Sequence, residues 1–190
     1  PATSARFVAD IRAHLVDGNA DLERQLMLDQ WVYQPGLPTN VARPDPSAFA
    51  EVDAASAAYA RAGTIDAARW NGWTTAERLR FLNHLPATMT VQQMLTLDTG
   101  LGLSRITNNE VLFAWLNRSL ANRYTVAVPV ADRFLNSVGR RKFVLPLFRT
   151  LWAQGDWGRD IARSIYAESR RGYHPVTTSS VDALMAEAAR

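Results

Sequence analysis

The chain has 190 residues, and its 21 basic and 18 acidic side chains give a net charge of +3. Apolar residues make up 47% of it and charged residues 21%, which excludes a disordered or collagen-like protein. It contains no cysteine, so disulfide frameworks, thiolate metal sites and thiol nucleophiles are excluded too. No apolar run approaches about 18 residues, so we expect no membrane span. Because no signal peptide is visible, we also expect a cytoplasmic location.

The first part of the chain is typical of helices followed by an extended linker. Apolar residues recur near the helical period from Phe7 through Leu15 to Trp31. Four prolines then fall within residues 35–46, and each removes a backbone donor and restricts φ. We therefore predict a stiff, extended linker at 35–46, and after it an alanine-rich helix from about Ser47 to Ala62.

Three predicted helix starts follow, each marked by a capping box, in which a threonine hydroxyl and a Glu or Gln side chain satisfy each other's backbone N–H groups. The pairs are Thr74 with Glu77, Thr90 with Gln93, and Thr107 with Glu110. The helix after Thr107 has the clearest apolar stripe, which is typical of core packing; it contains Val111, Leu112, Trp115, Leu116 and Leu120.

The last third of the chain also favours helices. The residues around Pro129 have strand-like composition, but proline would block a central strand, so we predict a helix with Pro129 in its first turn. We expect Gly139 to end this helix and Asp156 to cap a later one. His174-Pro175 should break the chain before a last helix from about Ser179. Short antiparallel helices without strands predict an all-α solenoid or irregular bundle.

No self-sufficient catalytic set is recognisable. The three histidines, His14, His84 and His174, are isolated from one another, and there is no H-E-x-x-H or G-x-S-x-G motif and no phosphate-binding glycine loop. We therefore predict no catalytic residue and no metal site in this chain. His84 and His174 are expected to be packing groups or caps at the C-terminal ends of helices, where a cation is favourable, and not ligands.

The positive charge is concentrated in one segment. Residues 137–175 carry eight basic and three acidic side chains, net +5, whereas residues 1–136 are net −1. The densest cluster is Arg140, Arg141 and Lys142, which includes the only lysine of the chain and lies where one helix should end and the next begin. Cations at a helix start are locally unfavourable unless they serve an anion, and Arg and Lys together suit a carboxylate. Alternatively, these cations neutralise the end of the preceding helix, and the residues alone leave both interpretations open.

The same segment resembles a known family. Gly139-Arg140-x-Lys142-Phe143-x-x-Pro146-Leu147-Phe148 is similar to the G-R-x-K-F-x-x-P-L-[FY] signature of the leukotriene A hydrolase C-terminal domain, which ends zinc aminopeptidases of the aminopeptidase-N-like family. Four other segments agree in order and spacing. Residues 31–38 resemble W-x-x-x-P-G-L-P, residues 108–115 resemble N-x-E-x-x-F-x-W, Pro129 matches a helix-borne proline, and residues 174–177 resemble H-P-V-T.

The resemblance implies an all-α fold, a right-handed α-α superhelix of paired antiparallel helices similar to armadillo or HEAT repeats. Residues 1–34 would be terminal helices of an upstream thermolysin-like catalytic domain, 35–46 a proline-rich linker, and 47–190 the C-terminal superhelix. The chain would then be a fragment of a bacterial-type zinc aminopeptidase. The zinc and the catalytic residues would lie in the missing catalytic domain, so the fragment alone should be inactive.

The resemblance also implies a role for two residues. In the family, the Arg and Lys of the signature bind the free carboxylate of the substrate, and they correspond to Arg140 and Lys142. Arg141 stands at a variable position and is not included. The expected partners are the catalytic domain of the same polypeptide and short peptide substrates, with the chain walling one side of the cleft.

Two other functions remain open at this stage. One is a stand-alone helical-repeat module that binds a protein partner. Its binding hot spots would come from the six tryptophans, which are Trp31, Trp70, Trp73, Trp115, Trp152 and Trp157. The other is nucleic-acid binding through residues 137–175, but the net charge is modest and no recognised motif is present, so we expect no nucleic-acid partner.

Overall fold

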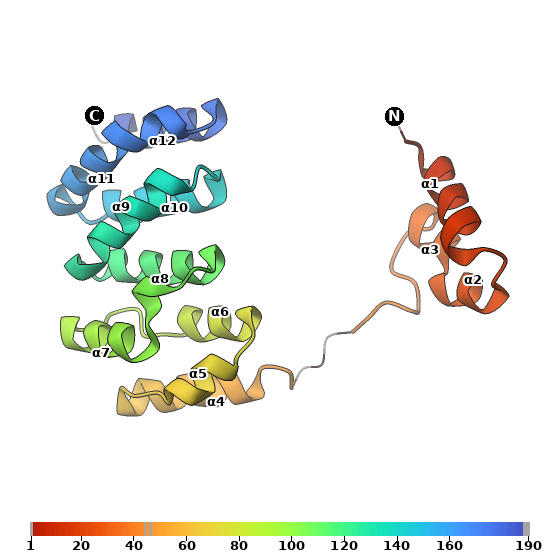
Figure 1. Ribbon diagram of the computed structural model, residues 1–190, viewed down its shortest axis with the longest axis horizontal. Helices are drawn as coiled ribbons and strands as arrows, with labels where there is room; N and C mark the ends of the chain where they lie inside the picture. The colour runs from red at the N-terminus through yellow and green to blue at the C-terminus, as the bar shows by residue number, and fades with distance from the viewer. Residues whose placement is uncertain (1, 44, 46, 188–190) are drawn as a thin grey trace. The chain divides into compact units, whose positions relative to one another are not determined.

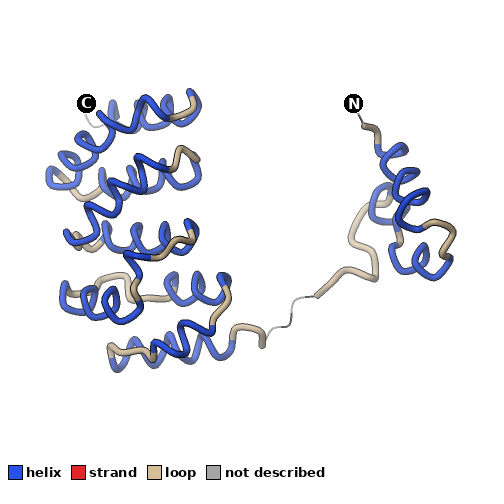
Figure 2. The backbone as a smooth tube through the Cα atoms, in the orientation of Figure 1, coloured by secondary structure: helices blue, strands red, loops and turns tan. Residues whose placement is uncertain are grey.

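The computed structural model describes residues 2–43, 45 and 47–187, so Pro44 and Pro46 of the predicted linker lie outside the described residues. The chain divides into two compact units, Pro1–Ala48 (unit 1) and Phe49–Arg190 (unit 2). Figure 2 shows helices and loops, and the described residues contain no strand. The all-α prediction is confirmed.

Unit 1 consists of α1 (Ser4–Ile11), a π-helical turn (Arg12–Val16), α2 (Ala20–Leu26) and α3 (Leu28–Tyr33). Its small core is formed by Val8, Val16 and Leu28. Phe7 and Leu15, which fit the apolar periodicity of the sequence, are 53% and 68% exposed. For Leu15 the π turn gives a reason, because its wider hydrogen bonds change the rotation per residue and bring Val16, not Leu15, to the core.

The helices of unit 2 form two layers (Figure 1). In the first layer, helices contact one another in succession; they are α4 (Ala50–Ala62), α6 (Thr75–Asn83), α8 (Asn109–Ala121), α10 (Arg141–Trp152) and α12 (Pro175–Glu187). The second layer contains α5 (Ala67–Gly72), α7 (Val91–Leu101), α9 (Val128–Ser137) and α11 (Asp156–Ser169). The stack runs from α4 and α5 at one end to α11 and α12 at the other, as in an α-solenoid (Figure 1). The right-handed superhelical sense stays a prediction.

A continuous apolar core lies between these layers. The predicted stripe of α8 supplies Val111, Trp115, Leu116 and Leu120, all at 0% exposure. Four of the six tryptophans are buried and Trp157 is partly buried, whereas Trp31 of unit 1 is 45% exposed. Most tryptophans therefore stabilise the core and are not available as hot spots for a protein partner.

Two of the three predicted capping boxes are confirmed, those of Thr74 with Glu77 and of Thr90 with Gln93. The third is wrong. Asn108, not Thr107, caps α8, and its side-chain oxygen accepts hydrogen bonds from the backbone N–H groups of Glu110 and Val111. An asparagine next to the threonine provides an equally good cap one residue later. The Glu110 side chain is thus released from the capping role.

Other predicted boundaries differ in part. Pro129 does lie in the first turn of α9, but Gly139 does not adopt the left-handed conformation of a glycine cap, and the extended residue Val138 is the C-cap of α9. Gly155, with a φ of 70°, precedes α11, so Asp156 is its first helical residue and not its cap. The last helix begins at Pro175, earlier than predicted, because proline at a first helical position loses no hydrogen bond.

The two histidines at predicted helix ends behave differently. His84 is the C-terminal cap of α6, and its Nδ1 lies 2.7 Å from the carbonyl oxygen of Arg80, as predicted. His174 instead precedes α12, where its Nδ1 accepts a hydrogen bond from the backbone N–H of Val176 at 3.3 Å. The prediction for His174 is wrong because the following proline starts a helix instead of delaying it.

A buried polar network joins α7 to α8 and to the loop after α8. The carboxylate of Asp98 accepts hydrogen bonds from the Ser104 N–H at 2.8 Å, the Ser104 hydroxyl at 2.7 Å and the Tyr124 hydroxyl at 3.3 Å. The Trp115 indole N–H donates to the Ser104 hydroxyl at 3.3 Å. Burial, together with the Asp98 charge, raises the pKa of Tyr124 to about 12. The network therefore holds a neutral tyrosine hydroxyl on a buried carboxylate.

We expect Tyr124 to make unit 2 sensitive to alkaline pH. A pKa of about 12 in the folded chain, against 10.0 ordinarily, gives a stabilisation that is present below about pH 10 and is lost as the pH rises through about 12. The loss attributable to Tyr124 is about 2–3 kcal/mol. Urea denaturation at pH 9, 10, 11 and 12 measures it. Tyr124→Phe should show a flatter decline, whereas the control Tyr33→Phe, in unit 1, should leave the decline unchanged.

Candidate carboxylate-binding site

The three clustered cations lie at the start of α10. Arg140 is the extended residue that precedes the helix, and Arg141 and Lys142 occupy its first two positions. The preceding helix, α9, ends at Ser137, so the cations belong to the N-terminus of α10 and not to the end of α9. Because a helix start carries partial positive charge, this arrangement disfavours the cations themselves and favours a bound anion.

Arg140 has an exposed side chain. Within the part of the chain that the structure describes, its guanidinium has neither an ion pair nor a side-chain hydrogen bond. Its backbone carbonyl accepts hydrogen bonds from Phe143 at 2.9 Å and Val144 at 3.1 Å, which fix the first turn of the helix. The planar guanidinium fork is therefore available for a carboxylate.

Lys142 is already engaged. Its ammonium forms an ion pair with the carboxylate of Glu110 in the first turn of α8, and it lies 4.8 Å from the centroid of the Phe143 ring. The Lys142 and Glu110 side chains are 45% and 40% exposed. Phe143 itself is buried and packs against Phe113 and Phe134, with ring centroids 5.3 and 5.8 Å away. Lys142 is thus held between α8 and α10, next to a cluster of packed phenylalanine rings.

Glu110 is the site residue that sequence reasoning missed, because it was assigned to a capping box. A signal was present, since Glu110 belongs to the segment that resembles N-x-E-x-x-F-x-W.

Arg141, which was not included among the carboxylate-binding residues, bonds to a different helix. Its Nε donates a hydrogen bond to the Ser180 hydroxyl on α12 at 2.8 Å. Arg141 therefore joins adjacent helices of the stack.

A pocket of about 400 Å³ lies between α6 and α8. Its lining residues are Leu79, Leu82, Asn83, Glu110, Phe113, Ala114, Asn117, Arg118 and Ala121. Glu110 lines this pocket and also pairs with Lys142, so the pocket adjoins the cationic start of α10.

Arg118 also lines the pocket. Burial lowers the pKa of Arg118, and its guanidinium donates hydrogen bonds to the backbone carbonyl oxygens of Asn83 and Pro86.

Much of the remaining positive charge in residues 137–175 is neutralised locally. Arg159, Arg163 and Arg170 form ion pairs with Asp156, Asp160 and Asp182. These pairs reduce the field that a nucleic acid would use, and the start of α10 is left as the main cationic feature of the segment.

Among the described residues, no three or more His, Asp or Glu side chains are grouped so that they could hold a metal ion. Over the same residues, we find no helix with the length and apolar composition needed to cross a membrane.

Residues 73–185 match the sequence model of a family described as leukotriene A4 hydrolase, C-terminal. The chain belongs to this family. The matched region contains Glu110, Arg140 and Lys142 together with the pocket between α6 and α8. All residues of the candidate site therefore lie within the region that matches the leukotriene A4 hydrolase C-terminal family.

Several curated relatives are named leucine aminopeptidase 2. The one from Neurospora crassa is 31% identical over 117 residues, covering 62% of this chain and 17% of the relative. The one from Ajellomyces capsulatus is 28% identical over 180 residues, covering 90% of this chain and 27% of the relative. These relatives are fungal, so they give the bacterial-type expectation no support.

Among solved structures, native yeast LTA4 hydrolase matches this chain with a TM-score of 0.66 at 19% sequence identity. The matched region covers 90% of this chain and 31% of the yeast chain. Yeast LTA4 hydrolase in complex with bestatin matches with a TM-score of 0.63 at 16% sequence identity. Here the matched region covers 95% of this chain and 32% of the yeast chain. This likeness shows the same helical fold. The chain spans less than a third of the length of the relatives that it matches.

Proposed function

We propose that this chain is the C-terminal domain of a zinc aminopeptidase, where it walls one side of the active-site cleft and binds the free carboxylate of short peptides through Arg140 and Lys142. The observation that carries the proposal is the Arg140 guanidinium, which lies at the N-terminus of α10 next to Lys142 and has no side-chain partner among residues 2–43, 45 and 47–187. Membership of the leukotriene A4 hydrolase C-terminal family and the likeness to leucine aminopeptidases support it.

The chemistry of the site suits one carboxylate. The Arg140 fork can donate two parallel hydrogen bonds to it, and the Lys142 ammonium and the helix start add positive potential. Binding the C-terminal end of a peptide would orient its other end toward the catalytic centre, so the contact would assist the reaction as well as affinity. This chain would supply no catalytic group of its own.

The proposal also assigns the parts of the chain. Residues 1–34 would be terminal helices of the catalytic domain, 35–46 the linker and 47–190 the C-terminal domain. Zinc and the catalytic residues would belong to the rest of the polypeptide, which would be the principal partner of this domain. A cytoplasmic location is part of the same proposal.

The test is Arg140→Ala in the full-length polypeptide. We expect kcat/KM for tripeptides to fall by about 10- to 150-fold, because a charge-assisted pair worth about 1.5–3 kcal/mol is lost. Steady-state kinetics measure it, with the C-terminal amides of the same tripeptides as substrates that lack the carboxylate; for these the variant should match the wild type. Arg141→Ala is the matched control and should have little effect. Unchanged efficiency of Arg140→Ala on free tripeptides would contradict the assignment.

A further inference from the structure

We infer that a hollow beside the start of α8 is a second anion-binding site, formed by Arg105 and Arg133, and that its ligand is a small organic phosphate with an apolar group. The hollow has a volume of about 310 Å³ and lies between α8, α9 and the turn that precedes α8. It consists of other residues than Arg140 and Lys142, so the inference does not rest on the proposed function.

Two arginines from separate elements line this hollow. Arg105 ends a 3₁₀ turn (Leu103–Arg105), and Arg133 lies on α9. Within the part of the chain that the structure describes, neither guanidinium forms an ion pair or a hydrogen bond, and none of the residues that line the hollow is acidic. Two positive charges therefore share one hollow without a counter-charge, an arrangement that attracts an anion.

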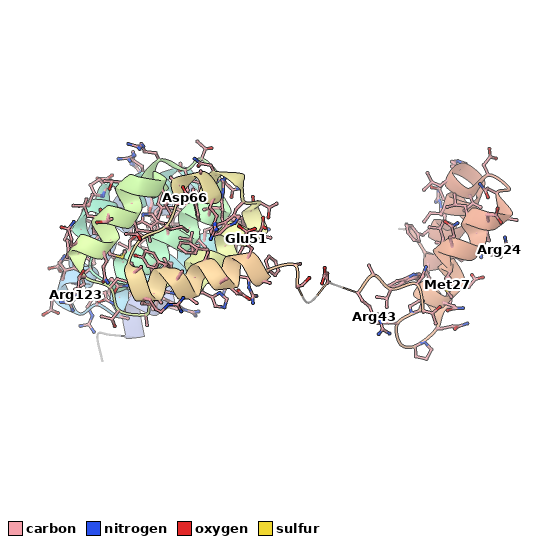
Figure 3. All side chains as sticks on the ribbon, turned by 90° about the horizontal axis from the view of Figure 1, so that it is seen from below. Arg24, Met27, Arg43, Glu51, Asp66 and Arg123 are labelled. Carbon is pink, nitrogen blue, oxygen red and sulfur yellow. The ribbon has the colours of Figure 1, made fainter. Side chains whose placement is uncertain are left out.

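Arginines also line other hollows of the chain, but those arginines have partners. Arg12 pairs with Glu23 and Asp29, Arg24 (labelled in Figure 3) pairs with Asp21, and Arg118 donates to the backbone carbonyl oxygens of Asn83 and Pro86. Such partners occupy the guanidinium donors, and a carboxylate also cancels the charge. Arg105 and Arg133 keep both their donors and their charge for a ligand.

The buried network of Asp98 holds the turn that carries Arg105. Ser104, the residue before Arg105, donates its N–H and its hydroxyl to the Asp98 carboxylate at 2.8 and 2.7 Å. Gly102 precedes the turn with a φ of 64°, which glycine adopts without strain. Because the turn is fixed in this way, a ligand that binds Arg105 pays less ordering entropy than it would on a mobile loop.

The floor of the hollow favours a ligand with an apolar part. Phe134 is 4% exposed, and Leu112 and Val130 are partly buried against the core. Each guanidinium fork can donate two parallel hydrogen bonds to phosphate oxygens, so two forks suit a phosphate monoester, which carries nearly two charges at neutral pH. The start of α8, at Asn109, adds positive potential. The hollow therefore suits a phosphate whose organic group rests on Phe134.

Isothermal titration calorimetry of the 190-residue chain with phenyl phosphate tests the inference. Inorganic phosphate lacks the ring and benzyl alcohol lacks the charge, so these two compounds separate the contributions of the floor and of the arginines. We expect phenyl phosphate to bind about 5- to 50-fold more tightly than inorganic phosphate, because part of its ring is buried. Benzyl alcohol should give no measurable binding. All titrations use one ionic strength, since salt screens the charges.

The variants are Arg105→Ala and Arg133→Ala. Each should weaken the binding of phenyl phosphate by about 5- to 20-fold, because each removes one charge-assisted pair from an accessible site. Arg105→Lys keeps the charge but loses the fork, so it should weaken binding less than Arg105→Ala does. The control is Arg61→Ala, which removes an exposed arginine from α4 and should leave the affinity unchanged. Urea midpoints equal to that of the wild type establish that each variant is folded.

The outcomes separate this site from the proposed carboxylate site. Arg140→Ala should leave the affinity for phenyl phosphate unchanged; if binding depends on Arg140 and not on Arg105 and Arg133, this inference is overturned while the proposed function stands. The inference also fails if phenyl phosphate does not bind, or if Arg61→Ala weakens binding as much as the two alanine variants do. Loss of binding in the full-length polypeptide would mean that another part of it covers the hollow, and would overturn the small-ligand assignment.

Discussion

Replacing Gly158 by alanine is expected to destabilise unit 2 by about 3 kcal/mol or more. A Cβ atom at this position would lie 1.9 Å from the carbonyl oxygen of Leu151, 2.9 Å from its carbonyl carbon and 2.8 Å from the Cβ of Gln154. A backbone carbonyl cannot rotate away as a flexible side chain can, so α10 and α11 would have to separate. That movement would disturb the hydrogen bond from the Gln154 N–H to the Leu151 carbonyl, which closes the turn between them.

Urea denaturation followed by circular dichroism measures this effect, and the chain offers a matched control. Gly100 also lies within a helix, α7, but nothing stands within 4 Å of its virtual Cβ. Gly100→Ala should therefore be neutral or stabilise the chain by up to about 1 kcal/mol, as alanine normally does in a helix. A loss below about 1 kcal/mol in Gly158→Ala would show that the two helices have more freedom than their packing indicates.

Removing the Asp98 carboxylate is expected to cost about 3–4 kcal/mol of unfolding free energy. In Asp98→Ala, the Ser104 N–H and hydroxyl and the Tyr124 hydroxyl lose their acceptor, and Tyr124 is fully buried. Buried donors without an acceptor are costly because water cannot replace the lost bond. The affected residues join α7, α8 and the loop after α8, so the loss should lower the cooperativity of the stack as well as its midpoint.

A double-mutant cycle with Tyr124→Phe separates this network from simple loss of packing. Tyr124→Phe should cost less in the Asp98→Ala background than in the wild type, because its hydroxyl has already lost its acceptor there. Asp98→Asn, which keeps one acceptor oxygen, should fall between the wild type and Asp98→Ala. Additive effects of the two substitutions would mean that the Asp98–Tyr124 hydrogen bond contributes little.

The helix starts show how far local sequence carries the prediction. The boxes of Thr74 and Thr90 formed as expected, since a capping box depends on residues three positions apart. At Thr107 the local rule failed because two neighbouring residues could each act as the cap. The released Glu110 then found a partner 32 positions away, in Lys142. A motif scan can identify the candidates for a cap but cannot choose between them when one side chain has a distant alternative.

The core of unit 1 shows a similar limit. Phe7 and Leu15 satisfy the helical period, yet both are exposed, and Leu15 lies within a π turn that changes the phase of the helix. Only five residues adopt this turn, and no residue type in them specifies it. The periodicity of α8, in contrast, is uninterrupted; four of the five residues of its predicted stripe are buried, and Leu112 is partly buried.

The sequence by itself was sufficient to predict the all-α fold and the family. It also predicted that the cations Arg140 and Lys142 lie at the start of a helix. These features depend on periodicity, on capping and on motifs within about ten residues, which are local properties of the chain. Only the tertiary structure decided that Arg140 has no side-chain partner within the described part of the chain and that Lys142 is paired with Glu110, and only it placed a pocket beside that pair. These depend on how α6, α8 and α10 pack, because packing alone brings charges from distant segments within reach of one another.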